Sequence, residues 1–171
     1  AKGDLILLTS PEIYYLTENC LNDMIKLCYE KPKALVIPEG GYDDRTGITS
    51  NRIISGLPTD ISREPVVSLN VEFPFCLMLT KQEFFTIGGY DEDFIGFAYE
   101  DADLVRRLIN NGGTYKKAEN HKILHLFHGT RTNFGREGLK DRQKQMDYNL
   151  NLYNQRERII KRNVNRPWGV L

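Results

Sequence analysis

Short apolar runs alternate with a stretch of helical spacing in the first forty residues, and this alternation most strongly limits the fold. Residues 5–8 (Leu-Ile-Leu-Leu) have the character of a strand buried on both faces, and residues 33–37 form a second strand ended by Pro38. Between them, residues 11–29 repeat apolar side chains at helical spacing, after a helix-start sequence at residues 9–12. A strand, a helix and a strand predict a crossover unit in a parallel sheet.

The remaining chain predicts more strands and helices and one long loop. Further strands are expected at residues 66–69, 75–80, 114–117 and 122–127. Helices are expected at residues 81–87 and 101–110, each followed by paired glycines, and a long polar helix at residues 136–162. Residues 40–64, with scattered Gly, Asp, Thr and Pro, predict a surface loop holding at most one short strand.

Composition is that of one soluble globular domain. The 171 residues are 40% hydrophobic and 27% charged, and 23 Lys and Arg balance 23 Asp and Glu, so no nucleic acid partner is expected. No apolar run is long enough for a membrane span. Cys20, Cys28 and Cys76 lack paired spacing, and as buried thiols they favour a reducing, cytoplasmic location.

Residues 88–104 are the densest candidate for a binding site. Gly88 and Gly89 let a ligand approach the backbone, and carboxylates are interleaved with Tyr90, Phe97 and Tyr99. Carboxylates accept hydrogen bonds from sugar hydroxyls, while aromatic rings cover the apolar face of a pyranose. Taken alone, acids in a first helical turn are more often caps than catalysts, and the acids at residues 91–93 are expected to form a solvated turn.

This segment resembles the C-terminal galactosyltransferase-type motif of GT-A fold glycosyltransferases, which include β-galactosyltransferases and chondroitin-polymerase-like bacterial enzymes. In that family a Gly-Gly-aromatic-Asp-Glu turn leads to a Glu-Asp pair that opens a helix, matching residues 88–92 and Glu100-Asp101 here. Arg106-Arg107-Leu108 match the helix that follows, in which the arginines are expected to face outward. The family's Trp-Gly-Gly before the acid pair is Phe97-Ala98-Tyr99 here, a departure that could alter acceptor preference.

The resemblance implies an α/β fold: the C-terminal portion of a GT-A (Rossmann-like) mixed sheet flanked by helices, with a long C-terminal helix. It implies one domain over residues 1–171, a fragment of a longer glycosyltransferase. The N-terminal nucleotide-binding half is then expected on a missing segment or a partner chain.

The activity implied is inverting transfer of a sugar from a nucleotide-sugar, of the UDP class, to a saccharide hydroxyl. Asp101 would be the general base and Glu100 an acceptor contact, and Tyr90, Phe97 and Tyr99 would wall the sugar site beside Gly88 and Gly89. Two alternatives stay open: a non-catalytic carbohydrate-binding or structural relative, and a retaining transferase of the mucin-type class.

The histidines near residue 125 form a second constellation. The family places a histidine after this strand as a ligand of the divalent metal, Mn²⁺, that holds the diphosphate; His128 is the match and His125 a second choice. If His125 ends a strand and His128 begins a turn, both could reach one cation, whereas strand alternation would send them to opposite faces. Arg131 could contact phosphate. Where relatives carry Asp-x-Asp, this chain has residues 9–11 (Thr-Ser-Pro), so Glu12 substitutes as ligand, or metal binding is weakened, or metal is absent.

Overall fold

A computed structural model describes residues 2–128 and 136–166 of the chain. The strands are β1 (Leu5–Thr9), β2 (Ile13–Tyr15), β3 (Ala34–Asp43), β4 (Val67–Ser68), β5 (Cys76–Thr80) and β6 (Thr114–His125). The helices are α1 (Cys20–Glu30), α2 (Ile48–Ile54), α3 (Lys81–Thr86), α4 (Glu100–Asn110) and α5 (Arg136–Gln155), with a 3-10 turn, η1, at Ile61–Arg63.

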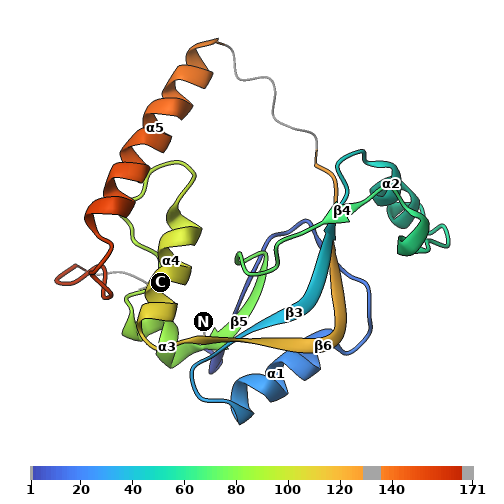
Figure 1. The fold of residues 1–171 in the computed structure, drawn as a ribbon, viewed down its shortest axis with the longest axis horizontal. Helices are drawn as coiled ribbons and strands as arrows, with labels where there is room; N and C mark the ends of the chain where they lie inside the picture. The colour runs from blue at the N-terminus through green and yellow to red at the C-terminus, as the bar shows by residue number, and fades with distance from the viewer. Residues whose placement is uncertain (1, 129–135, 167–171) are drawn as a thin grey trace.

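The described residues form one mixed six-stranded sheet, in the order β1-β5-β3-β6-β2, with β4 paired to β3. The pairing of β3 with β6 is parallel, and every other pairing is antiparallel. The register between β3 and β6 shifts between Pro38 and Gly40, and beyond this point both strands turn away from α1 (Figure 1). The far arm of the bent pair carries β2 and β4.

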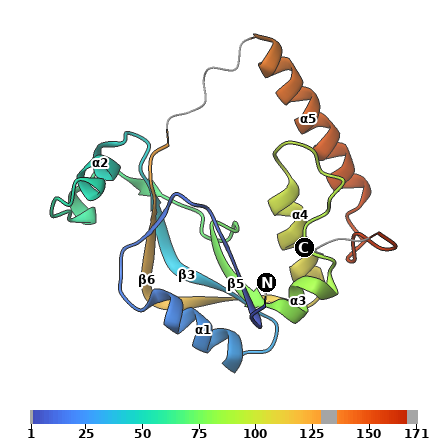
Figure 2. The ribbon, with the colours of Figure 1, turned by 180° about the vertical axis from the view of Figure 1, so that it is seen from behind.

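The core lies where the central strands meet the helices. Leu35, Val36 and Ile37 of β3 and Leu77 and Leu79 of β5 are fully buried. Helix α1 covers one face with Cys20, Met24 and Cys28, and α3, α4 and α5 gather beyond the β5 side of the sheet (Figure 2). The predicted buried thiols are confirmed, since Cys20, Cys28 and Cys76 are all buried and free. Burial raises the pKa of the Cys28 thiol to about 12.

The mixed α/β class is confirmed, and β1 and β3, the two strands of the predicted crossover unit, run in the same direction because each is antiparallel to β5. The two strands are not neighbours, since β5 lies between them, so the sheet is mixed rather than parallel. Strand β1 is consequently an edge strand that is only partly buried, not buried on both faces. The GT-A character of the sheet stays a prediction.

The predicted helix at residues 11–29 begins only at Cys20. Residues 13–15, Ile-Tyr-Tyr, instead form β2, which pairs with Ile123, Leu124 and His125 of β6. β-Branched and aromatic residues favour strands, and the available edge of β6 decided their conformation. The residues expected to start the helix form a turn, in which the Ser10 hydroxyl donates to the Glu12 carboxylate.

Four further expectations about boundaries are wrong. Pro38 does not end β3, because it stands at the register shift, where a missing amide donor is tolerated. The predicted loop at residues 40–64 contains α2 and η1, and the two strands predicted at residues 114–127 are one strand, β6. Helix α5 ends at Gln155, seven residues before the expected boundary of 162. By contrast, the short helices α3 and α4, each followed by glycines, are confirmed.

The outward position expected for Arg107 is also wrong. Leu104 and Leu108 face the core as predicted, but Arg107 is 0% exposed. Its Nε donates to the Asp103 carboxylate at 2.6 Å, and its Nη1 donates to the carbonyl oxygens of Ile87 and Gly89. A buried guanidinium is stable only when paired in this way.

No helix among residues 2–128 and 136–166 is both long and apolar enough to span a membrane.

Replacing Arg107 tests whether this buried pair supports the fold. Arg107→Ala leaves the Asp103 carboxylate without its closest partner in the core, so the free energy of unfolding should fall by about 3–5 kcal/mol in urea denaturation. Arg63→Ala, at an arginine whose side chain is 85% exposed, serves as the control and should change it by less than about 1 kcal/mol. Equal effects of the two substitutions would contradict the role given to Arg107.

Candidate functional site

The end of β6 and the turn after β1 bring three potential metal ligands together. One ligand atom from each of Glu12, His125 and His128 lies within 4.8 Å of the others. The rings of His125 and His128 meet edge to face, with centroids 5.1 Å apart. Of the two arrangements left open, the shared one is observed, because β6 ends at His125 and strand alternation no longer applies at His128.

The His125 ring is oriented from the neighbouring strand. Its Nδ1 lies 3.0 Å from a carboxylate oxygen of Asp43, the last residue of β3, and the two residues are register partners. A carboxylate on Nδ1 fixes the ring orientation and leaves Nε2 as the ligand atom, the usual arrangement around metal-binding histidines. Asp43 is itself paired with Arg45 at 3.2 Å.

Glu12 is held against the same strand end. The Leu126 amide donates to the Glu12 carbonyl oxygen at 2.9 Å, and the Ser10 hydroxyl donates to its carboxylate. The Ser10 hydrogen bond, together with the nearby charges of His128 and His125, lowers the pKa of the Glu12 carboxyl. Glu12 is thus anionic and preplaced, as a metal ligand requires.

A buried turn before α2 supports the segment that carries His128. Asp44 is 1% exposed, and its carboxylate accepts hydrogen bonds from Thr46, Gly47 and Ser50. Burial opposes ionisation of Asp44, but these hydrogen bonds outweigh it and lower the pKa. The Ser50 hydroxyl in turn accepts from the Phe127 amide at 2.8 Å. The residue before His128 is therefore fixed by α2.

The acid pair opens α4, as predicted. The Tyr90 hydroxyl donates to Asp101 Oδ1 at 2.8 Å, which leaves Oδ2 free of that bond. Burial and the charge of Asp101 raise the pKa of Tyr90, so the phenol stays a donor. Glu100 Oε2 is buried without a hydrogen-bond partner in the part of the chain that the structure describes, and burial raises the pKa of this carboxyl.

The backbone before the acid pair is left-handed at residues that are not glycine. Ala98 and Tyr99 have φ of 78° and 71°, a conformation that costs of order 1–3 kcal/mol per residue. Asn149 of α5, which is 0% exposed, compensates by donating to the carbonyl oxygens of Ile95, Phe97 and Ala98 and accepting from the Ile95 amide. Asn149 therefore positions the turn that leads into Glu100 and Asp101.

The acids at residues 91–93 are not the solvated turn expected from the sequence. Asp91 is 4% exposed and pairs with Arg156 at 2.5 Å and with Arg162 at 2.8 Å, and Asp93 pairs with Arg156 at 2.6 Å. Arg162 also reaches Asp103 at 3.1 Å. This network fastens the segment after α5 to both the acidic turn and α4.

Gly88, Phe97 and Tyr99, which were predicted to contact a sugar, contact other parts of this chain. A side chain at Gly88 would collide with the Arg162 carbonyl oxygen, so the close approach at this glycine is made by the chain's own backbone. The ring of Tyr99 packs on Tyr153 at 5.6 Å, and the guanidinium of Arg142 lies 3.9 Å from the Phe97 ring centroid. Gly89 follows with φ of 64°, and Arg131 lies outside the described residues.

The start of α4 and the end of β6 both lie on the side of the molecule away from α1 (Figure 1). The proposed roles of Asp101 as base and His128 as metal ligand require that the two face a shared cleft, and this stays a prediction.

Comparison with known families bears on both halves of this geometry. Residues 72–129 match a family model described as the N-terminal domain of galactosyltransferase. The resemblance to galactosyltransferases is confirmed over these residues. No curated protein matches the chain.

The matched segment contains the acid pair and both histidines but not Glu12. Its family implies glycosyl transfer and sugar substrates, and typically a metal. Several residues that hold its site were missed from the sequence: Asp43, Asp44, Ser50, Asn149 and Arg162. Only Asp43-Asp44, as two adjacent acids, carried any signal, and their place at the end of β3 became visible only in the structure.

The orphaned Glu100 carboxylate predicts a pH-dependent stability. A raised folded-state pKa penalises the native state above that pKa, and the penalty disappears once the carboxyl is protonated in both states. Glu100→Gln should therefore raise the free energy of unfolding by about 1 kcal/mol at neutral pH, and the gain should vanish as pH falls through the raised pKa. Urea denaturation at several pH values measures this, with exposed Glu157→Gln as control. A pH-independent gain, or an equal gain at Glu157, would refute it.

Proposed function

We propose that this chain forms the acceptor and metal-binding part of an inverting glycosyltransferase that uses a nucleotide-sugar, of the UDP class, and a saccharide acceptor. The observation that carries the proposal is the convergence of Glu12 with His125 and His128. Both histidines lie in the matched segment that also carries Glu100 and Asp101 at the start of α4. The uridine pocket would come from a nucleotide-binding half on another segment or a partner chain.

The converging residues fit a divalent transition metal. Two imidazoles and one carboxylate suit such an ion, and Asp43 supplies the oriented outer contact that a metal-bound histidine needs. Mn²⁺ is the proposed ion, and when bound it would neutralise the charge of the leaving diphosphate. Glu12 would occupy the place of the family's Asp-x-Asp, which residues 9–11 lack.

Asp101 is the proposed general base. The Tyr90 hydroxyl donates a hydrogen bond to Oδ1 of Asp101 and so fixes the orientation of the Asp101 carboxylate. The Oδ2 atom stays available to take a proton. A single positioned carboxylate suffices to take the proton as the acceptor oxygen attacks the anomeric carbon from the face opposite the nucleotide. Glu100, with a buried oxygen that lacks a partner, would accept a hydrogen bond from the acceptor.

The cellular location proposed is the cytoplasm. The three buried cysteines are free, as expected in a reducing compartment.

Asp101→Asn in the full-length protein tests the base assignment. An amide cannot take the proton, so kcat should fall by about 10²–10⁴-fold while the urea unfolding midpoint is unchanged. Asp141→Asn, at an exposed acid of α5, should retain activity. Near-normal transfer by Asp101→Asn would refute the role of base.

NMR of the product should show an inverted anomeric configuration, and a retained one would favour the mucin-type class.

Metal titration separates the enzyme from a non-catalytic relative. Calorimetry of the full chain should detect Mn²⁺ binding that is tighter than Mg²⁺ binding, because imidazole ligands discriminate against Mg²⁺. His128→Ala should abolish this binding, and Asp43→Asn should weaken it by about 10–100-fold through loss of ring orientation. His121→Ala, at the histidine outside the cluster, is the control. Absence of Mn²⁺ binding by the unaltered chain would contradict the metal site and favour the non-catalytic alternative.

A further inference from the structure

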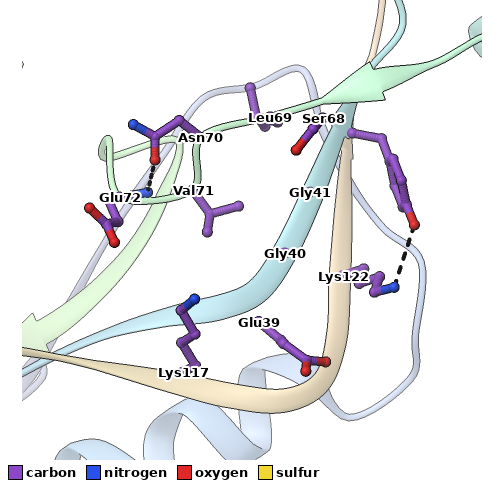
Figure 3. Close-up of a pocket in the computed structure, with 11 residues that line it drawn as sticks. Glu39, Gly40, Gly41, Ser68, Leu69, Asn70, Val71, Glu72, Lys117 and Lys122 are labelled. Carbon is purple, nitrogen blue, oxygen red and sulfur yellow. Dashed lines mark hydrogen bonds between the residues drawn. The ribbon is translucent and has the colours of Figure 1, made fainter.

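A polar groove outside the metal cluster follows the bent arm of the sheet. Two adjoining depressions, of about 560 and 290 Å³, share Asn70 and Glu72 in their walls. The first lies along residues 39–42 of β3, between the loop carrying Asn70 and Glu72 and the strand carrying Lys117 and Lys122 (Figure 3). The second continues to the side of α4. Together their size is that of a binding site for a small organic molecule or a short chain of sugars.

The groove offers both donors and acceptors without a matching partner. Asn70 uses its carbonyl oxygen to accept from the Glu72 amide at 3.1 Å, which leaves its NH₂ group available. Within residues 2–128 and 136–166, the Glu72 carboxylate and the Lys117 ammonium have no hydrogen bond or ion pair. The charges of Glu39 and Glu72 balance those of Lys117 and Lys122. Such a lining matches neutral hydroxyl groups, which donate and accept, better than it matches an anion or a cation.

Aromatic side chains line the second depression. Tyr115 is fixed there by donating its hydroxyl to the Glu72 carbonyl oxygen at 2.5 Å, and Phe73 is 43% exposed at the rim. The guanidinium carbon of Arg106 lies over the ring of Tyr153, 3.6 Å from the centroid of that ring. The Nε of Arg106 is buried without a hydrogen-bond partner among the described residues. Aromatic surface beside polar groups suits the alternating apolar and hydroxyl-bearing faces of sugar rings.

The groove is open over Gly40. A side-chain carbon built on this glycine meets no atom within 4 Å, and its backbone is not left-handed. By contrast, the same addition at Gly41 would meet a Val71 carbon at 2.9 Å. A larger residue at position 40 can therefore fill the groove without straining the fold.

The groove also adjoins the proposed base, because Ala102 in its wall directly follows Asp101. We infer that this groove is an acceptor subsite that binds the additional sugar units of a neutral oligosaccharide, extending from α4 along β3. The inference rests on the proposed function and gives its acceptor a class: a chain of several neutral sugars rather than a single sugar.

Binding of size-fractionated oligosaccharides tests the inference without donor or metal. The probes are fragments from partial acid hydrolysis of the producing organism's own polysaccharides, separated by length and by charge. Saturation-transfer NMR with the full chain should show that longer neutral fragments bind roughly tenfold more tightly than monosaccharides, a gain of about 1.4 kcal/mol. Gly40→Phe should remove that gain, and Glu30→Phe, which adds the same ring to the exposed end of α1, should keep it.

Three results would overturn the inference: no dependence on length, preference for charged fragments, or identical binding by Gly40→Phe and the unaltered chain. Failure of the proposed function has a different signature. Absence of transfer by the full-length protein, with length-dependent binding intact, would refute the enzyme and leave the groove as a saccharide site.

Discussion

A buried arginine holds together the part of this molecule that carries α4. Arg107 lies in the core with Asp103 and binds the carbonyl oxygens of Ile87 and Gly89. A buried guanidinium is costly without partners, so the hydrogen bonds of Nε and Nη1 tie these groups together, although Nη2 has no hydrogen-bond partner among the described residues. The glycine turn after α3 is thereby fixed to α4, whose first turn carries Glu100 and Asp101.

The C-terminal part of the chain completes the same unit. Arg162 joins Asp91 to Asp103, and Asn149 holds the left-handed turn just before the acid pair. The Trp-Gly-Gly motif that this turn resembles would place glycines there, where a left-handed backbone carries no steric cost. Here Ala98 and Tyr99 adopt it, and the amide of Asn149 supplies the hydrogen bonds that offset the strain.

The candidate metal site is built on a different element, the far arm of the bent sheet. Strand β6 ends at His125, and β3 ends beside it at Asp43. The turn after β1 places Glu12 next to His125 and His128. Each ligand has its own support, from Asp43, from Ser10, or through Ser50 and the Phe127 amide. The bend at Pro38 and Gly40 separates this arm from the core that anchors α4, and the proposed saccharide groove lies along it.

The sequence by itself determined the features that depend on neighbouring residues. Apolar runs located β3 and β5, paired glycines located the ends of α3 and α4, and local motif resemblance selected Asp101 and His128. Tertiary structure decided what depends on partners far along the chain. Residues 13–15 form a strand because they pair with the edge of β6. Arg107 points into the core because a carboxylate and two carbonyl oxygens accept its hydrogen bonds there. Asn149 gave no local signal, since the carbonyl groups it satisfies lie about fifty residues earlier. Spacing in a sequence encodes periodicity along one element, whereas hydrogen-bond partners between elements are set only when the chain is packed.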